Sequence, residues 1–244
     1  MQRMNAAART LVVLAALVWA RAASAQDPLV LLPQAYKLVL ENDWVKVVRV
    51  HYAPHEKLPM HDHTEQAAAY VYLNDCGPVT FKHDWGDLTR PATKTGSFRL
   101  YDAVQEIHEV DNPNDEPSDF LRVEFKTRPI SVLTFKGRFH REPNPDGQGP
   151  KKVQFDHPQL RVSRYLIAPG LKEDFSSPVE PSLVIALTRG TLKADGGPVA
   201  EEIVLEPGLV RWLPKASATT FENVGASAVE ILRFDLKTEP LAVH

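Results

Sequence analysis

Two histidines separated by one residue are the feature of this sequence that most directly predicts a chemistry. His61 and His63 flank Asp62, and residues two apart in a strand point to the same face of a sheet. A third histidine, His108, follows a series of strand-like segments and precedes Asn112 by four residues. A fold that stacks the two segments would gather three imidazoles around one divalent ion. The spacing therefore predicts a metal site, and it does not name a substrate.

These residues resemble the two sequence motifs of the cupin superfamily. The first cupin motif contains H-x-H, which His61 and His63 supply, and the second ends in H-x3-N, which His108 and Asn112 supply. The resemblance implies an antiparallel β-barrel of the double-stranded β-helix type with a divalent metal ion in it. On this resemblance we expect Fe, Mn, Zn or Ni, without choosing among them.

Several positions depart from the family motifs. The glutamate of the first motif falls on Ala67 or Ala68, so the usual carboxylate ligand is missing and the fourth ligand is open. The two glycines of the first motif fall on His55 and on Asn74 or Asp75. In the second motif the first glycine falls on Ser97, one place after Gly96, and the proline and the later glycine fall on Ala103 and Gln105.

Three residues near the histidine pair are candidates for the rest of the site. Glu65 shares strand parity with His61 and His63 if the strand continues, whereas a turn after His63 would break that parity. Gln66 offers a carbonyl oxygen to the metal or a hydrogen bond to a ligand. If neither binds, the site resembles three-histidine cupins with open positions for water, substrate or dioxygen. Tyr70 either fills the barrel core or contacts the substrate.

An internal repeat predicts two tandem barrels. The segment 121–129 (LRVEFKTRP) recurs at 232–240 (LRFDLKTEP), an offset of 111 positions, and the same offset carries Asn112 to Asn223. Upstream of Asn223, the spacing of Gly208 and Pro214 fits the second cupin motif. The resemblance therefore covers nearly all of the chain that follows the N-terminal segment.

The second copy lacks the metal-binding residues. Thr219 stands at its histidine position, and counting five residues on from Gly170 places Ser176 and Pro178 where the histidine pair would be. Serine, proline and threonine cannot replace three imidazoles at such a site. We therefore predict one metal per chain, in the N-terminal barrel, and a degenerate, structural C-terminal barrel.

The remaining segments favour an all-β fold with a linker between the barrels. Runs of β-branched and aromatic residues predict strands at 44–52, 69–73, 160–167, 183–187 and 209–213, and 20 prolines and 12 glycines separate such segments. We predict a first barrel at 26–137, a linker rich in proline and glycine at 138–152 and a second barrel at 153–244.

Residues 1–25 have the pattern of a signal peptide. Arg3 and Arg9 form a positive region, an apolar stretch follows, and Ala23-Ser24-Ala25 resembles a cleavage site before Gln26. We expect a periplasmic or secreted protein with no stable membrane association. Without this segment the chain has 25 basic and 31 acidic residues, which argues against nucleic acid as a partner. Cys76 is the only cysteine, so no intramolecular disulfide can form.

Two classes of function are compatible with these patterns. One is a metal-dependent enzyme, for which the resemblance to cupin dioxygenases makes oxygenation of a small molecule the first hypothesis. The other is a non-catalytic cupin that binds a small molecule in the same pocket, and a homodimer is left open for both. The sequence contains no G-x-S-x-G elbow, C-x-x-C pair, H-E-x-x-H or glycine-rich phosphate loop, so hydrolase, thiol-redox and nucleotide chemistry lack support.

Overall fold

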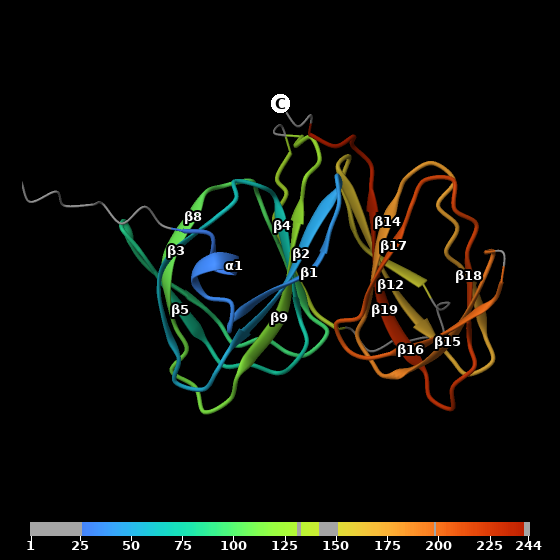
Figure 1. The fold of residues 1–244 in the computed structure, drawn as a ribbon, viewed down its shortest axis with the longest axis horizontal. Helices are drawn as coiled ribbons and strands as arrows, with labels where there is room; N and C mark the ends of the chain where they lie inside the picture. Colours follow the sequence, from blue (N-terminus) through green and yellow to red (C-terminus); the bar gives the residue numbers. More distant parts are fainter. Residues whose placement is uncertain (1–25, 131–132, 142–150, 198, 242–244) are drawn as a thin grey trace, which may run out of the picture.

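The computed structural model describes residues 26–130, 133–141, 151–197 and 199–241, and the predicted signal peptide lies outside the described residues. Within these ranges the chain forms 19 strands and one short helix, α1 (Pro28–Leu31). Every strand pair is antiparallel, and the strands gather into two barrels that lie side by side (Figure 1). The prediction of an all-β fold with two tandem barrels is confirmed.

The first barrel consists of two facing sheets. Its larger sheet contains, in spatial order, β1 (Tyr36–Glu41), β2 (Val45–Tyr52), β9 (Ser118–Phe125), β4 (Ala68–Tyr72), β7 (Phe98–Tyr101) and β10 (Gly137–Phe139). Its smaller sheet contains β3 (Lys57–His63), β8 (Glu106–Asp111), β5 (Val79–His83) and β6 (Gly86–Arg90). Helix α1 lies beside β1 and β3, at the open end of this barrel (Figure 1).

The second barrel repeats the same strand order. Its larger sheet contains β11 (Lys151–Asp156), β12 (Leu160–Ile167), β19 (Val229–Leu236), β14 (Ser182–Ala186) and β17 (Val210–Leu213). Its smaller sheet contains β13 (Lys172–Asp174), β18 (Thr220–Asn223), β15 (Gly190–Asp195) and β16 (Glu201–Leu205). The five strands predicted from the sequence are all present, with ends displaced by at most one residue.

Three apolar cores hold the molecule together, and the alternation of side chains along a strand decides which core each residue joins. In β4, Tyr70 and Tyr72 point into the first barrel, whereas Ala69 and Val71 point out of it. The outward residues do not face solvent, because the larger sheets of the two barrels pack on each other and form the third core. This arrangement explains why β4, β14 and β19 are buried along their whole length.

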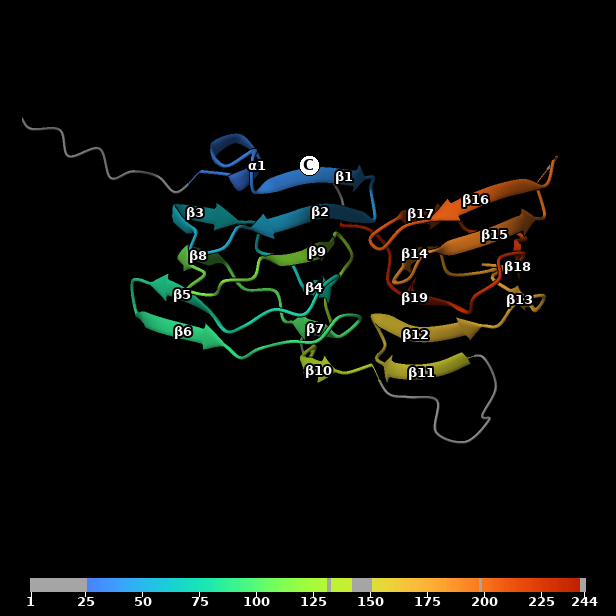
Figure 2. The same ribbon diagram turned by 90° about the horizontal axis from the view of Figure 1, so that it is seen from below.

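The contact between the barrels is nearly symmetric. The Arg164 guanidinium in the second barrel donates a 2.6 Å hydrogen bond to the Gly96 carbonyl in the first. In the reverse direction, a Cβ at Gly208 would lie 2.8 Å from Leu73 and 3.7 Å from the Arg49 guanidinium of the first barrel. Figure 2 shows the two halves meeting along the larger sheets, with β12 beside β7 and β14 beside β9.

Backbone conformation supports the alignment with the two motifs. Among the described non-glycine residues, only His55 and Ala216 have positive φ, of 56° and 59°, and both stand where a cupin motif has glycine. Gly96 and Gly208 have φ of 76° and 88° and make equivalent backbone bonds to Tyr72 and Ala186. The first glycine of the second motif is therefore Gly96, and not the neighbouring Ser97 that its spacing to His108 indicates.

The connection between the barrels is shorter than the predicted linker of 138–152. Strand β10 pairs with β7 through Arg138 and Phe139, and Lys151 and Lys152 already belong to β11. Residues 142–150, the centre of the predicted linker, lie outside the described residues. In the part of the chain that the structure describes, no helix has the length and apolar character needed to cross a membrane.

Candidate metal centre

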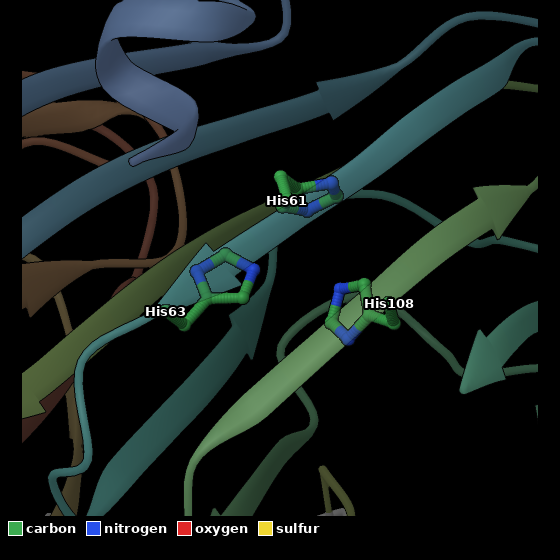
Figure 3. A group of neighbouring side chains, drawn as sticks. All are labelled: His61, His63 and His108. Carbon is green, nitrogen blue, oxygen red and sulfur yellow. The ribbon is translucent and has the colours of Figure 1, made fainter. Parts of the chain in front are cut away.

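Three histidines come together inside the first barrel. His61 and His63 lie on β3, and His108 lies opposite His61 on the neighbouring strand β8, with all three rings facing one another (Figure 3). Each side chain is at most 8% exposed, and one nitrogen of each lies within 4.8 Å of those of the other two. Within the described residues, this is the one group of histidine, cysteine or acidic side chains placed to hold a metal ion.

A β-bulge in β3 orients His61. The register shifts between Leu58 and His61, so Pro59 and Met60 together lie opposite the single residue Glu109. In this bulge the His61 Nδ1–H donates a 2.8 Å hydrogen bond to the Pro59 carbonyl. Because Nδ1 holds the proton of the neutral ring, Nε2 is the nitrogen with a free lone pair for a metal.

The chemistry of the three side chains fits a metal ion. Both ring nitrogens of His108 are buried and have no hydrogen-bond partner, although buried polar atoms are normally paired. Burial lowers the pKa of His61 and of His63, and it lowers that of His108 to about 2, so all three rings are neutral at physiological pH. Neutral imidazole is the form that binds metals, and a metal ion would supply the partner that His108 lacks.

A buried ionic cluster lies next to the histidines. Glu106 accepts a 2.9 Å hydrogen bond from Arg90 and further hydrogen bonds from Arg122 and Tyr70. Burial opposes ionisation of this carboxyl, but the two guanidinium groups outweigh it and hold the pKa of Glu106 below its usual value. Arg122 also donates to Glu124 at 2.9 Å, so charges of both signs are paired beside the site.

Two buried tyrosines approach the histidines from the opposite sheet. The Tyr36 hydroxyl lies 2.8 Å from His61 Nε2 and 2.9 Å from the Tyr52 hydroxyl. Tyr36 is in β1 and Tyr52 in β2, so neither belongs to a cupin motif. Burial raises the pKa of both tyrosines far above the usual value, and the neighbouring Tyr52 raises that of Tyr36 further. Both hydroxyls are therefore protonated.

A pocket of about 180 Å³ connects this region with the surface beside α1. Its walls include Asp27, Lys46 and Asp62 at the outside and Tyr36 and His63 at the inside. A narrow interior cavity, too small to hold a water molecule, continues past His63 towards Tyr70 and His108. Because a cavity of about 150 Å³ can hold benzene, this pocket is large enough for a molecule with a single ring.

The structure places the other three predicted site residues in different surroundings. Strand β3 ends at His63, and Glu65 follows in a bend with its side chain exposed, so the strand parity that would have aimed it at the metal is broken. Gln66 is half-buried in the same bend, with an amide oxygen that has no partner. Tyr70 faces the interior cavity, but its hydroxyl is engaged by Glu106 and Arg122.

In the second barrel, strand pairing places Phe175 and Ser177 where the first has its histidine pair. Phe175 is hydrogen-bonded to Thr219, and Ser177 forms a bridge to Ser217, just as His61 and His63 pair with His108 and Glu106. The prediction of Ser176 and Pro178 for these positions is therefore wrong by one residue. The cause is the bulge in β3, because β13 has no extra residue at that place.

The sequence reasoning missed several residues around the site. His83, at the end of β5, stacks on Trp85, and its ring centroid lies 5.3 Å from that of His108. Alternation from the buried Phe81 could have placed His83 on the inward face. No comparable pattern signals Tyr36 or Arg90, which reach the site only because distant strands are stacked.

Comparison with known proteins identifies the fold through structure alone. No protein-family model matches the sequence, and no curated protein matches it. Many solved structures share the architecture, and three of them illustrate it. AerE from Microcystis aeruginosa has a TM-score of 0.58 at 15% identity, with 83% of this chain and 97% of that chain covered.

The other two are a salicylate 1,2-dioxygenase and a cupin 2 conserved barrel domain protein. The dioxygenase from Pseudaminobacter salicylatoxidans has a TM-score of 0.55 at 13% identity, over 79% of this chain and 71% of that chain. The Leptotrichia buccalis barrel protein has a TM-score of 0.52 at 14% identity, over 83% and 88%. This chain therefore has the fold of a bicupin, with a histidine cluster suited to a metal ion in its first barrel, and the described residues of the second barrel hold no such cluster.

Proposed function

We propose that this protein is a metal-dependent dioxygenase that acts on a small molecule in the first barrel. The observation that carries the proposal is the buried group of His61, His63 and His108, in which both nitrogens of His108 have no hydrogen-bond partner among the described residues. The structurally similar salicylate 1,2-dioxygenase, which has the same fold, supports this choice of reaction. A redox-active ion such as Fe(II) or Mn(II), when bound by the three imidazoles, would supply the centre for oxygen chemistry.

The residues around the histidines have separate roles in this proposal. Phe81 packs on the His108 ring, with centroids 4.9 Å apart, and keeps bulk water from that side. The outer pocket admits the substrate past His63 and brings it to the open side of the cluster. The paired charges of Glu106, Arg90 and Arg122 hold Tyr70 in place at the inner wall.

Oxygen uptake by the full chain tests the proposal. After anaerobic loading with Fe(II), gentisate and salicylate are the first probes, because that salicylate dioxygenase has also been solved with gentisate, and phenols, diketones and thiols follow. We expect uptake that disappears in His108→Ala and persists in Thr219→Ala, its counterpart in the second barrel. Equal uptake by the two variants would remove the reason for placing the reaction at the histidines.

A binding protein without turnover is the alternative that the same experiment identifies. Its signature is a rise in unfolding temperature with a small molecule that depends on His108 and is accompanied by no consumption of that molecule or of oxygen. Such a result with every class of probe would replace the enzymatic proposal.

We further propose that the protein is exported and that its mature form begins near Gln26. The order of positive, apolar and small residues in 1–25 supports this. Gln26, the first residue that the structure describes, has a carbonyl that accepts a 3.1 Å hydrogen bond from the Asp62 amide of the first barrel. Intact-mass measurement on protein from its native host is the test. A cytoplasmic form that retains residues 1–25 would contradict export.

A further inference from the structure

The hydrogen bonds around His61 leave one phenol proton without an acceptor once a metal binds. His61 Nδ1–H donates to the Pro59 carbonyl, so Nε2 is an acceptor and the Tyr36 hydroxyl must be the donor in their 2.8 Å contact. The Tyr36 oxygen in turn accepts from the Tyr52 hydroxyl at 2.9 Å. The chain of donors therefore runs from Tyr52 to Tyr36 to His61.

A metal on Nε2 takes the lone pair that Tyr36 uses. The two tyrosines then hold two phenol protons, and only one of them has an acceptor within the pair. If Tyr36 turned to donate to Tyr52, the Tyr52 proton would lack an acceptor instead, since Tyr36 is the one partner of the Tyr52 hydroxyl among the described residues. Leaving a buried donor unsatisfied costs about 1–3 kcal/mol, so a new acceptor is favoured.

The position of Tyr36 decides where that acceptor must come from. Tyr36 lines both the outer pocket and the interior cavity, as do His63 and Arg122, whereas Tyr52 lines only the interior side. A small molecule that enters through the outer pocket therefore meets Tyr36 before Tyr52.

The second barrel serves as an internal control for this assignment. Strand pairing places Lys151 at the position of Tyr36 and Ile167 at that of Tyr52, because Lys151 and Tyr36 pair with equivalent residues of β12 and β2. The two phenols are therefore absent from the barrel that lacks the histidines, although the backbone is the same. A purely structural need of the fold does not explain them.

We propose that Tyr36 is a hydrogen-bond donor to the exogenous ligand of the metal centre, and not itself a fourth metal ligand. The inference rests on the proposed metal site and adds the residue that recognises what binds there. The ligand class that fits is a small molecule or anion with an oxygen or nitrogen lone pair directed at Tyr36.

Cobalt(II) and azide provide a test that does not depend on turnover. The full chain is loaded with Co(II), whose affinity is measured by chelator competition, and azide binding is followed by the visible spectrum. We expect Tyr36→Phe to bind Co(II) at least as tightly as the wild type, because a competitor for Nε2 is gone. Its azide dissociation constant should rise about 3- to 10-fold, the loss of one hydrogen bond.

Two further variants make the result interpretable. Tyr52→Phe leaves the Tyr36 donor in place and should keep azide affinity near that of the wild type. Tyr165→Phe removes a buried tyrosine hydroxyl from the second barrel and should change neither measurement.

Unchanged azide affinity in Tyr36→Phe that still holds Co(II) would overturn the donor role alone. Loss of Co(II) from Tyr36→Phe would overturn it in favour of a ligand role. A wild type that takes up no Co(II) would overturn the proposed metal site itself, and the donor role with it.

Discussion

The two barrels have the same strand order and nearly the same motif glycines, but different side chains fill their interiors. In the first, histidines, tyrosines and paired charges surround a cavity. In the second, Phe175 occupies the place of His61 and packs on Tyr165 and Phe221, with ring centroids 4.4 and 4.7 Å away. The difference shows that this fold does not need a polar interior in order to form.

Residues that recur in both barrels belong to the architecture. Asn112 donates to the Ala53 carbonyl at 2.8 Å, and Asn223 donates to the Ile167 and Ser227 carbonyls at the same distance, so both close the same turn. Arg233 donates to Asp235 as Arg122 does to Glu124. These contacts give Asn112 and Asn223 the same structural role.

Residues found in one barrel only are the candidates for function. Strand pairing gives Val184 for Tyr70 and Ser217 for Glu106, in addition to the replacements at the three histidines. The polar side chains that differ between the two barrels therefore include Tyr70 and Glu106 beside the histidines. The repeat within one chain thus separates the needs of the fold from those of the site.

The largest expected difference between the barrels is in metal content. His108→Ala removes one of three imidazoles and should reduce bound metal from about one ion per chain to a small fraction, while Thr219→Ala should leave it unchanged. Elemental analysis of the purified full chain measures both. One ion retained by a variant that lacks His61 and His63, or two tightly bound ions in the wild type, would break the comparison.

A second contrast concerns stability. Glu106→Gln leaves Arg90 and Arg122 buried with one negative charge fewer, and should cost about 3–5 kcal/mol of unfolding free energy. Ser217→Ala, at the matching place in the second barrel, removes a hydroxyl that has no partner and should be near neutral. Urea unfolding of the two variants measures both changes in unfolding free energy. Similar losses of unfolding free energy in the two variants would mean that Glu106 contributes no more to stability than Ser217 does at the matching place.

Much of the fold follows from patterns within single segments, and the site follows less well. His55 and Ala216 show that spacing can identify a glycine position even where glycine is absent. The count from Gly170 gave Ser176 and Pro178 instead of Phe175 and Ser177 because β3 contains a bulge. One extra residue in a strand cannot be recognised from the alternation of its side chains. The contacts of Tyr36 and Arg90 depend on which strands stack, which local pattern does not encode.

The shared turns should respond alike in the two barrels. Asn112→Ala and Asn223→Ala each leave buried carbonyls without their amide donor, so each should lose about 1–3 kcal/mol. Unfolding in urea, followed for both variants under one set of conditions, measures the two losses. A loss confined to Asn112→Ala would assign that residue to the metal centre instead of to the architecture.

The smallest predicted effect concerns a backbone position. Ala216 adopts a φ of 59°, which costs a residue with a Cβ roughly 1 kcal/mol, so Ala216→Gly should be neutral or stabilising by up to about 1 kcal/mol. The midpoint of thermal unfolding should stay constant or rise slightly. A clear decrease would mean that the Ala216 methyl makes packing contacts worth more than the strain.

The reciprocal contacts of Gly96 with Arg164 and of Gly208 with Leu73 amount to an isologous interface within one polypeptide. Such an interface places corresponding positions of the two halves against each other, although the side chains of the halves differ. If the chain were divided between β10 and β11, each fragment would expose the apolar face that now lies between the barrels. Two N-terminal fragments would then be expected to pair with each other and to carry two histidine clusters in one assembly, whereas the tandem chain limits every such pair to one.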